Sequence, residues 1–340
     1  MKAWLFTSAS GGLEKNLHLS DSAPLPPTAK SLPPDHTLVQ VIACALNPVD
    51  HKVVEIPVVG GFVVKTPSSP GIDFAGRVVA TGANTNKVAS DDLRPGQLVF
   101  CMLGGPTQYG PLGEYTVVSR EGCVPLPSGV DPVDASGIGV AGSTAYQCIV
   151  PKAKKGDNVF INGGSGGTGT FGIQIAKAIG CDVTTTCSTA NVELCKSLGA
   201  DEVIDYKKQD IVEALKKSGK KYDLVVDNVG HDTSLYWRCH EYTSSGAQYV
   251  QVGAPSALLG FAGIAKMMVW PTLLGGGKRP YQFLGAKTKY EDLKQIGQWM
   301  QEGKVKAIID QKFAFEDAPK AFEKLKTGRA KGKVVVEVAQ

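Results

Sequence analysis

The glycine-rich segment at residues 163–169 restricts the possible folds of this chain more than any other feature. It reads Gly-Gly-Ser-Gly-Gly-Thr-Gly, follows a predicted buried strand near 157–162 and leads into a predicted helix near 167–179. Glycines spaced in this way allow a tight turn and a close backbone approach, while the helix start offers N–H groups and its dipole to a pyrophosphate. A flexible glycine-rich turn is the alternative. We expect a dinucleotide phosphate loop formed by Gly164, Ser165, Gly166, Gly167, Thr168 and Gly169.

The rest of the chain divides into two patterns. Buried strands near 157–162, 181–187, 222–227, 247–253 and 281–286 alternate with helical stretches near 167–179, 190–198, 208–218, 232–243 and 290–302. This alternation predicts an α/β fold with a doubly wound parallel sheet. Residues 1–127 instead show short strands between turn-forming clusters, which indicates a β-rich, partly barrel-like domain. Since the tail returns to strand, helix and strand, we expect one domain at 1–127 with 306–340, and another at 128–305.

Charge and cysteine content exclude several classes of protein. The chain carries 36 Lys and Arg against 32 Asp and Glu, a net charge of +4, with neither sign in long blocks, so we expect no nucleic-acid partner. Its eight cysteines include no Cys-x-x-Cys pair and are too sparse for a disulfide scaffold, which indicates a reducing compartment. The N-terminal segment lacks the apolar run of a signal peptide. We expect a cytoplasmic protein.

A long apolar stretch at residues 258–277 raises the question of a membrane. Lys266, Pro271 and the terminal glycines interrupt it, so we expect no transmembrane segment. The simpler interpretation is a buried helix and loop that line a pocket or pack on a second subunit. A peripheral membrane-surface helix is the alternative. The sequence is compatible with a monomer or a homodimer.

The choice of nicotinamide cofactor depends on the end of the second strand of the parallel sheet. An acidic side chain at that place normally binds the ribose hydroxyls of NAD. Here the strand ends in Cys187 and continues with Ser188, Thr189 and Asn191, without a carboxylate, and Asp182 lies too far back at the strand start. Hydroxyl and amide groups can donate to a 2′-phosphate. NADPH is therefore the expected cofactor, although helix capping is a competing role for Ser188 and Thr189.

Several segments together resemble the medium-chain dehydrogenase/reductase superfamily, in particular chloroplast-envelope and fungal members of its zinc-free quinone oxidoreductase and enoyl reductase branch. They cover nearly the whole chain in the family's order. The resemblance implies a Rossmann cofactor domain and a GroES-like catalytic domain. The segments are ALNPVDHK (45–52), PGIDFAG (70–76), RPGQLVF (94–100), AGSTAYQ (141–147), the glycine loop, KSLGADEVIDY (196–206), KYDLVVDNVG (221–230) and GKVVVEV (332–338).

The resemblance also implies that the family's catalytic zinc site is absent. The positions that match the zinc ligands of the alcohol dehydrogenases are Asn47, Ile72 and Val140, none of which has the thiolate or imidazole that zinc prefers. The four-cysteine structural zinc lobe has no counterpart, because only Cys101 and Cys123 fall in that region. A rival site from Cys44 and His51 would lack a third ligand. We expect no bound metal.

Without a metal, the reaction that the resemblance implies is hydride transfer to an activated acceptor, because a few hydrogen-bond donors can stabilise the charge that develops on its oxygen. Asn47 replaces a zinc ligand and is expected to position the nicotinamide or the acceptor carbonyl. Lys52 resembles the lysine of the enoyl reductase branch, with a solvated helix lysine as the alternative. Tyr109 is a candidate proton donor, with bulk water equally suitable. Asp50 and His51 are interpreted as a helix-start residue and a packing or surface residue.

Further cofactor contacts follow from the resemblance alone. Thr144 matches a threonine near the nicotinamide, although a helical threonine often bonds its own backbone. Tyr206 matches a tyrosine that flanks the adenosine phosphate. Arg329 and Lys331 resemble basic residues that reach the 2′-phosphate, with a solvated pair as the alternative. Val252 and Gly253 end a strand near the expected position of the carboxamide.

The sequence therefore predicts a zinc-independent, NADPH-dependent reductase of a quinone or of the C=C bond of an α,β-unsaturated carbonyl, acting on a small molecule bound between the two domains. An accessory enoyl reductase of a polyketide or fatty-acid pathway is one alternative. A weakly catalytic, membrane-associated NADPH-binding protein is another.

Overall fold

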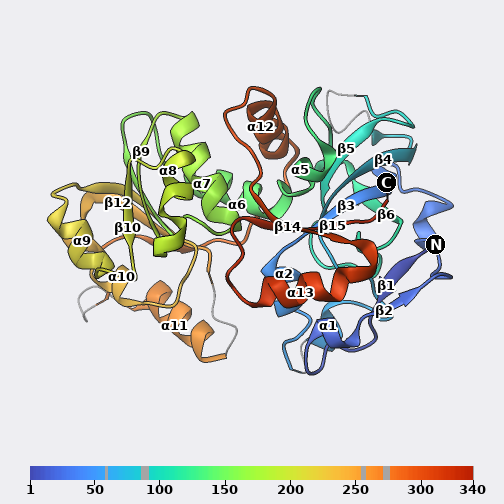
Figure 1. Ribbon diagram of the computed structural model, residues 1–340, viewed down its shortest axis with the longest axis horizontal. Coiled ribbons are helices and arrows are strands. Elements are labelled where there is room, and N and C mark those ends of the chain that lie inside the picture. Colours follow the sequence, from blue (N-terminus) through green and yellow to red (C-terminus); the bar gives the residue numbers. More distant parts are fainter. Residues whose placement is uncertain (58–59, 86–91, 254–257, 271–275, 340) are drawn as a thin grey trace. The chain divides into compact units, whose positions relative to one another are not determined.

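The computed structural model describes residues 1–339 except 58–59, 86–91, 254–257 and 271–275, and it leaves out the side chains of 258–263. The described residues form two compact units. Unit 1 comprises Met1–Ser143 and Lys287–Gln340, and unit 2 comprises Thr144–Ala286. Both chain ends lie in unit 1 (Figure 1).

Unit 2 is built around a parallel sheet whose order determines where a ligand can bind. The strand order is β10-β9-β8-β11-β12-β13, and every neighbouring pair is parallel. The chain order reverses between β8 and β11, which makes their carboxyl ends the switch point of the doubly wound Rossmann fold. The strands are β8 (Asn158–Asn162), β9 (Asp182–Cys187), β10 (Glu202–Asp205), β11 (Tyr222–Asp227), β12 (Thr243–Gln251) and β13 (Tyr281–Phe283).

Helices flank this sheet (Figure 1), and a buried core rich in aromatic side chains forms within unit 2. Phe160, Tyr222 and Tyr242 pack with ring centroids 5.8–6.4 Å apart. The helices are α7 (Gly167–Ala178), α8 (Val192–Ser197), α9 (Ile211–Lys217), α10 (Ser234–Trp237) and α11 (Leu258–Val269), with 3₁₀ turns η3 (Thr189–Asn191) and η4 (Cys239–Glu241). Helix α6 (Gly139–Ile149) crosses the border between the units.

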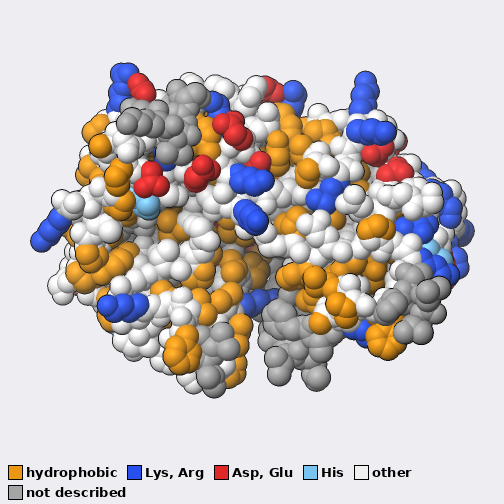
Figure 2. Space-filling model, turned by 180° about the vertical axis from the view of Figure 1, so that it is seen from behind, with side chains coloured by type: hydrophobic (Ala, Val, Ile, Leu, Met, Phe, Trp, Pro, Cys, Tyr) orange, Lys and Arg blue, Asp and Glu red, His pale blue; other side chains and the backbone are white. Residues whose placement is uncertain are grey.

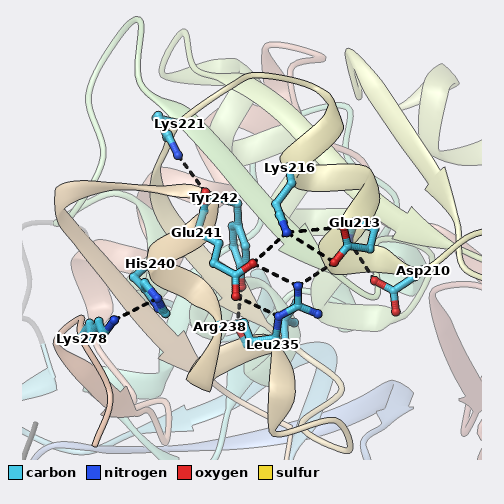
Figure 3. A network of polar contacts seen from close by, with 10 residues as sticks. All are labelled: Asp210, Glu213, Lys216, Lys221, Leu235, Arg238, His240, Glu241, Tyr242 and Lys278. Atoms are coloured by element: carbon cyan, nitrogen blue, oxygen red, sulfur yellow. Dashed lines mark hydrogen bonds and ion pairs between the residues drawn. The ribbon is translucent and has the colours of Figure 1, made fainter. Parts of the chain in front are cut away.

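A polar network fastens α9 to the α10–η4 segment (Figure 3). Arg238 donates from Nη2 to Glu213 Oε1 at 2.6 Å and from Nε to Glu241 Oε1 at 2.9 Å. Lys216 Nζ lies 3.0 Å from Glu241 Oε2. Such exposed pairs contribute little stability individually, so the network mainly fixes the orientation of the two segments.

Unit 1 is a mostly antiparallel, β-rich unit. Its main sheet has the order β14-β15-β3-β4-β5-β7, with β6 paired to β3, and only β14 and β15 run parallel. A separate hairpin pairs β1 with β2. The strands are β1 (Ala3–Leu5), β2 (His18–Ser20), β3 (His36–Leu46), β4 (Asp73–Thr81), β5 (Leu98–Met102), β6 (Tyr115–Ser119), β7 (Cys123–Pro125), β14 (Ile309–Ala314) and β15 (Lys333–Glu337).

Unit 1 also contains helices and 3₁₀ turns. Helix α13 packs Phe322 and Ala321 against Leu46 and Val334 in one buried cluster. The helices are α1 (Leu13–Asn16), α2 (Pro48–Lys52), α3 (Gly60–Val63), α5 (Pro132–Ser136), α12 (Tyr290–Gln301) and α13 (Ala318–Lys326), with 3₁₀ turns η1 (Pro27–Ala29), η2 (Arg120–Gly122) and η6 (Phe315–Asp317).

The structure differs from two sequence expectations. The expected helix at 232–243 is divided into α10 and η4, because Tyr242 turns its hydroxyl back to the Leu235 carbonyl at 2.5 Å and the chain enters β12. The borders of the compact units lie at 143/144 and 286/287 rather than 127/128 and 305/306. Helix α12 belongs to unit 1, because Gly297 packs against the Phe100 ring and Pro127.

The apolar stretch at 258–277 lies partly outside the described residues. Within the described part of the chain no helix has both the length and the apolar character needed to cross a membrane. The last residues of α11 and Trp270 expose large apolar side chains, with Met268 62%, Val269 75% and Trp270 45% exposed. On the face shown in Figure 2, apolar and charged side chains are interspersed.

Candidate active site

The glycine loop joins β8 to α7 at the switch point of unit 2. Its first turn is held to the end of β9, because Gly163 N–H donates to Thr186 Oγ1 and Gly164 N–H to the Thr186 carbonyl, both at 2.8 Å. A Cβ atom at Gly169 would overlap the Gly163 carbonyl oxygen and lie 2.7 Å from Gly164 Cα. Glycine at 169 therefore permits the close approach of helix and loop.

Gly166 lies in a different environment from the other glycines of the motif. It is the N-cap of α7, where no side chain caps the helix, and a Cβ there would find no atom closer than the Gly163 carbonyl oxygen at 3.7 Å. The first N–H groups of a helix have no acceptor inside the helix. The start of α7 is therefore open and electropositive, as a pyrophosphate requires.

Two asparagines at the same edge of the sheet carry unused hydrogen-bonding groups. Among the described residues, both amide atoms of Asn228 and the Oδ1 atom of Asn191 are buried without a partner. Asn191 Nδ2 donates to Ser165 Oγ at 3.0 Å. Buried polar atoms without partners are rare in folded proteins. Their place beside the open helix start fits a bound dinucleotide.

Asn228 is a candidate ligand that sequence reasoning missed. It directly follows β11, whose last residue, Asp227, pairs in register with Asn162 at the end of β8. The Asp227 carboxylate organises this edge by accepting from Asn162 Nδ2 at 2.8 Å and from Val229 and Gly230 N–H at 2.9 and 3.0 Å. The available signal was a polar residue immediately after a predicted buried strand.

The expected adenosine end of the site contains a carboxylate that the pattern of β9 alone did not reveal. Asp205, at the end of the neighbouring β10, accepts from Thr189 Oγ1 at 2.6 Å and from Lys207 N–H at 3.0 Å. The Thr189 hydroxyl bond above all lowers the pKa of Asp205. Ser188 precedes η3 without a side-chain capping bond, so the structure does not show the capping role considered for it.

The remaining expected cofactor residues of unit 2 differ in exposure and in hydrogen bonding. Tyr206 is 47% exposed, and the Lys207 ammonium lies 5.5 Å from its ring centroid. Thr144 is buried on α6. The N–H groups of Val252 and Gly253 both donate to the Asp227 carbonyl, at 2.8 and 3.2 Å, and are thus used within unit 2.

Asn47 is the centre of a buried polar cluster in unit 1. It lies between β3 and α2 and is 3% exposed. Its N–H donates to Asp50 Oδ2 at 2.6 Å, its Nδ2 donates to Asp73 Oδ2 at 2.8 Å, and its Oδ1 accepts from Lys333 Nζ at 2.5 Å. The amide that we expected to face a nicotinamide or substrate is therefore engaged inside unit 1. Its role toward a ligand stays a prediction.

Burial and like charge dominate the electrostatics of this cluster. Burial first, and then the nearby Asp73 carboxylate, raise the pKa of Asp50 to about 8. Burial also raises the pKa of Asp73, although the Lys333 ammonium opposes this shift. The same burial raises the pKa of the Cys44 thiol. Asp50 also lines a small hollow with Val54 and Ser69.

Helix α2 carries the other two chemical groups of interest. Lys52, its last residue, is half-buried, and burial lowers its pKa. His51 is buried with Nδ1 3.1 Å from Glu55 Oε2, and burial lowers the pKa of its ring. Asp50 acts as the helix-start residue that we expected, through its bond to Asn47.

The other expected residues of unit 1 do not join the Asn47 cluster. Tyr109 lines a second hollow together with Met1, Leu5 and Ala23, and its carbonyl accepts from Thr116 Oγ1 at 2.6 Å. Arg329 and Lys331 are exposed in the segment between α13 and β15. The proposed roles of all three stay predictions.

The described residues contain no group of three or more His, Cys, Asp or Glu side chains placed to hold a metal ion. Cys44 lies in the interior of β3 beside Asp50, Asp73 and Lys333, whereas His51 pairs with Glu55. The positions that resemble zinc ligands contribute Asn47 to the polar cluster through its side chain and Val140 through its N–H, which donates to Asp73 Oδ1 at 2.8 Å.

Comparisons with known proteins agree with this architecture. Residues 33–128 match the model of the alcohol dehydrogenase GroES-like domain, and residues 198–336 match that of the zinc-binding dehydrogenases. The trans-enoyl reductase pgmF of Aspergillus terreus is 55% identical over 99% of this chain and 96% of its own length. The chloroplastic quinone-oxidoreductase QR1 of Triphysaria versicolor is 33% identical over 99% and 98%. The solved quinone oxidoreductase from Coxiella burnetii superposes with a TM-score of 0.82 at 28% identity, over 99% of each chain.

Proposed function

Because this chain belongs to the medium-chain dehydrogenase/reductase superfamily, we propose that it is an NADPH-dependent reductase of the C=C bond of enoyl thioesters. The observation that carries the cofactor assignment is the open start of α7 at the switch point, with the unpartnered Oδ1 atom of Asn191 and the unpartnered amide of Asn228 beside it. The trans-enoyl reductase relative supports the substrate class. The two curated relatives reported above are named as a reductase and an oxidoreductase, which supports reductase chemistry for this chain.

The preference for NADPH rests on the groups at the ends of β9 and β10. Ser188 offers a hydroxyl, and Lys207 and Lys208 follow Asp205 with exposed ammonium groups. The Asp205 carboxylate is already occupied by Thr189 and by the Lys207 backbone. A 2′-phosphate would therefore meet cations and the Ser188 hydroxyl rather than a free carboxylate.

We expect kcat/KM to be at least about 10-fold higher with NADPH than with NADH, because each charge-assisted contact to the phosphate favours its binding. The measurement is the loss of nicotinamide absorbance with an enoyl thioester as acceptor. Lys207→Gln should weaken NADPH binding but leave NADH binding unchanged, whereas exposed Lys217→Gln on α9 should change neither. A preference for NADH would contradict this cofactor assignment.

The proposed reaction needs a hydride and a proton. When bound, the cofactor supplies a hydride to the β-carbon of the enoyl group, and the electron pair of the C=C bond moves toward the carbonyl oxygen. The substrate then needs one proton at its α-carbon. Lys52 is the proposed source, because burial lowers the pKa of its ammonium and so makes it a better acid. While protonated, it also stabilises the developing negative charge.

We expect Lys52→Met to lower kcat roughly 100-fold, the usual contribution of a positioned general acid. The Kd of NADPH, followed by protein fluorescence, should stay unchanged. The alkaline fall of kcat, which reports loss of the Lys52 proton, should disappear from the pH profile of the variant. Exposed Lys304→Met is the matched control. Equal kcat and pH profiles for the Lys52 variant and the wild type would remove Lys52 from the reaction.

Reduction of quinones and free enones is the second candidate function. The relatives named quinone oxidoreductases favour it, as does the 2-methylene-furan-3-one reductase of Solanum lycopersicum, 32% identical over 99% of this chain. Competition between an enoyl thioester, the matching free enone and a quinone separates the candidates. A higher kcat/KM for the quinone would overturn the thioester proposal while leaving the cofactor assignment in place.

A further inference from the structure

We infer that Lys333 is a positioning residue, which fixes Asn47 and the start of α2 through a buried ionic network. Lys333 is the first residue of β15 and is only 2% exposed. Its ammonium donates to Asn47 Oδ1 at 2.5 Å and lies 3.4 Å from Asp73 Oδ2. A lysine so deeply buried is uncommon unless it is paired. The inference rests on the proposed function, because the groups that Lys333 positions are those of the proposed reaction.

The network joins segments that are far apart in the chain. Asp73, the first residue of β4, accepts from Asn47 Nδ2 with one oxygen and from Val140 N–H, at the start of α6, with the other. Lys333 adds β15, which is 286 residues from Asn47. A Cβ atom at Gly139 would overlap the Asp73 carboxylate, so glycine at 139 makes room for this arrangement.

The Lys333 ammonium lies close to positions that match zinc ligands of the alcohol dehydrogenases. Asn47 and Val140 match two of the positions that hold zinc in the alcohol dehydrogenases that this chain resembles, and here both contact one buried ion pair. The Lys333–Asp73 ion pair thus contacts two segments whose counterparts hold zinc in those dehydrogenases, Asn47 through both partners and Val140 through Asp73. An ammonium has three hydrogen-bond donors and no acceptor, so every polar atom that it contacts here must be an acceptor.

The direction of these bonds determines how the Asn47 amide is oriented. Lys333 is a donor only and Asp73 is an acceptor, so the Asn47 oxygen must face Lys333 and its NH₂ group must face Asp73. Asp50 holds the backbone of the same residue through its N–H. Since α2 has only five residues and ends at Lys52, fixing its start at two points also limits the movement of Lys52.

The test compares Lys333→Met with the double variant Lys333→Met/Asp73→Asn. We expect Lys333→Met to lower Tm by about 10 °C, because Asp73 is left as an unpaired buried charge. The double variant removes this charge and should regain most of the lost Tm. The Asn47 amide of this variant should rotate by about 180°, because the asparagine introduced at position 73 presents an NH₂ group that needs the Asn47 oxygen as acceptor.

The kinetic result separates positioning from a purely structural role. We expect kcat of the double variant to stay roughly 10- to 100-fold below wild type, as misplaced groups lose rate steeply with small displacements, with KM for NADPH changed less than about threefold. Exposed Lys320→Met, on α13, should match wild type throughout. A double variant with wild-type Tm and wild-type kcat would overturn the inference, as would Lys333→Met with both unchanged.

Failure of the proposed function gives a different pattern. A wild-type protein that binds NADPH but reduces no thioester, enone or quinone disproves the proposed reaction, whatever the variants do. In that case the crystal structure of the double variant tests Lys333 directly. An unchanged Asn47 amide and an unmoved α2 would show that Lys333 does not position them.

Discussion

Gly169→Ala is expected to abolish dinucleotide binding and to lower the free energy of unfolding by about 2–4 kcal/mol, as overpacking against backbone does. The new methyl group would overlap the Gly163 carbonyl oxygen and press on Gly164 Cα, which are backbone atoms that cannot turn aside. The end of β8 and the start of α7 must then separate. Calorimetric titration with NADPH and urea unfolding measure the two effects.

Two neighbouring glycines supply the controls for this substitution. Gly172→Ala on the same helix places its methyl at ordinary contact, 3.4 Å from Ile161 Cδ1, and should bind NADPH normally while gaining up to about 1 kcal/mol of helix stability. The methyl of Gly166→Ala would make only an ordinary contact of 3.7 Å with the Gly163 carbonyl oxygen, so this variant should fold like wild type. Its methyl nevertheless projects beside the open helix start, and NADPH binding should fall roughly 10-fold because the pyrophosphate can no longer approach closely.

The three variants together separate folding from ligand contact. Loss of binding in Gly166→Ala without loss of stability would locate the phosphate at the start of α7. Normal NADPH binding by both Gly166→Ala and Gly169→Ala would show that the dinucleotide lies elsewhere, and the glycine loop would not be its phosphate site.

The fold was predictable where local signals coincide. In unit 2, buried strands alternate with helices in the order that a doubly wound sheet needs, and the glycine motif at Gly164, Gly166 and Gly169 marks its first strand-to-helix turn. The observed strand order agrees with that prediction. The structure of the segment at 232–243 was not predictable from its helical pattern. The Tyr242 ring is buried and its hydroxyl donates to the Leu235 carbonyl, and the chain continues into β12 instead of a longer helix.

The candidate site was predictable only where its residues adjoin in sequence. The glycine loop could be found from a local pattern, whereas Asn47 and Lys52 were proposed from the family resemblance of their segment. Lys333 and Asp73 could not be connected, because their contact forms only when β15 and β4 flank β3 in the folded sheet. Asp205 was missed for the same reason: it reaches Thr189 from the strand beside β9, not from β9 itself.

Asp50→Asn is expected to make the protein more stable than wild type at neutral and alkaline pH. The Asp50 carboxyl is 3% exposed, and its Oδ1 atom has no hydrogen-bond partner among the described residues. Burial and the neighbouring Asp73 raise its pKa to about 8, from an ordinary value of 3.8. Asparagine keeps an oxygen that can accept from Asn47 N–H, but it never has to be buried as an anion.

The sign of the effect follows from proton linkage. Between pH 3.8 and about 8 the folded protein holds a proton on Asp50 that the unfolded chain has released. The stabilisation from this proton is complete below pH 3.8, declines by up to about 1.4 kcal/mol per pH unit, and is lost once the pH passes the folded pKa. Asp50→Asn removes this decline, so its advantage over wild type should grow with pH to roughly 2–5 kcal/mol at pH 8.

Urea unfolding of wild type and variant at four pH values between about 5 and 8 measures the effect. Exposed Asp182→Asn, at the start of β9, should follow the wild-type curve and controls for the loss of one carboxylate from the chain. Stability curves that stay parallel for Asp50→Asn and wild type would mean that Asp50 is ionised in the folded protein throughout this range. The buried cluster would then carry a net negative charge beside Asn47, and the Lys333 ammonium would have to balance two carboxylates instead of one.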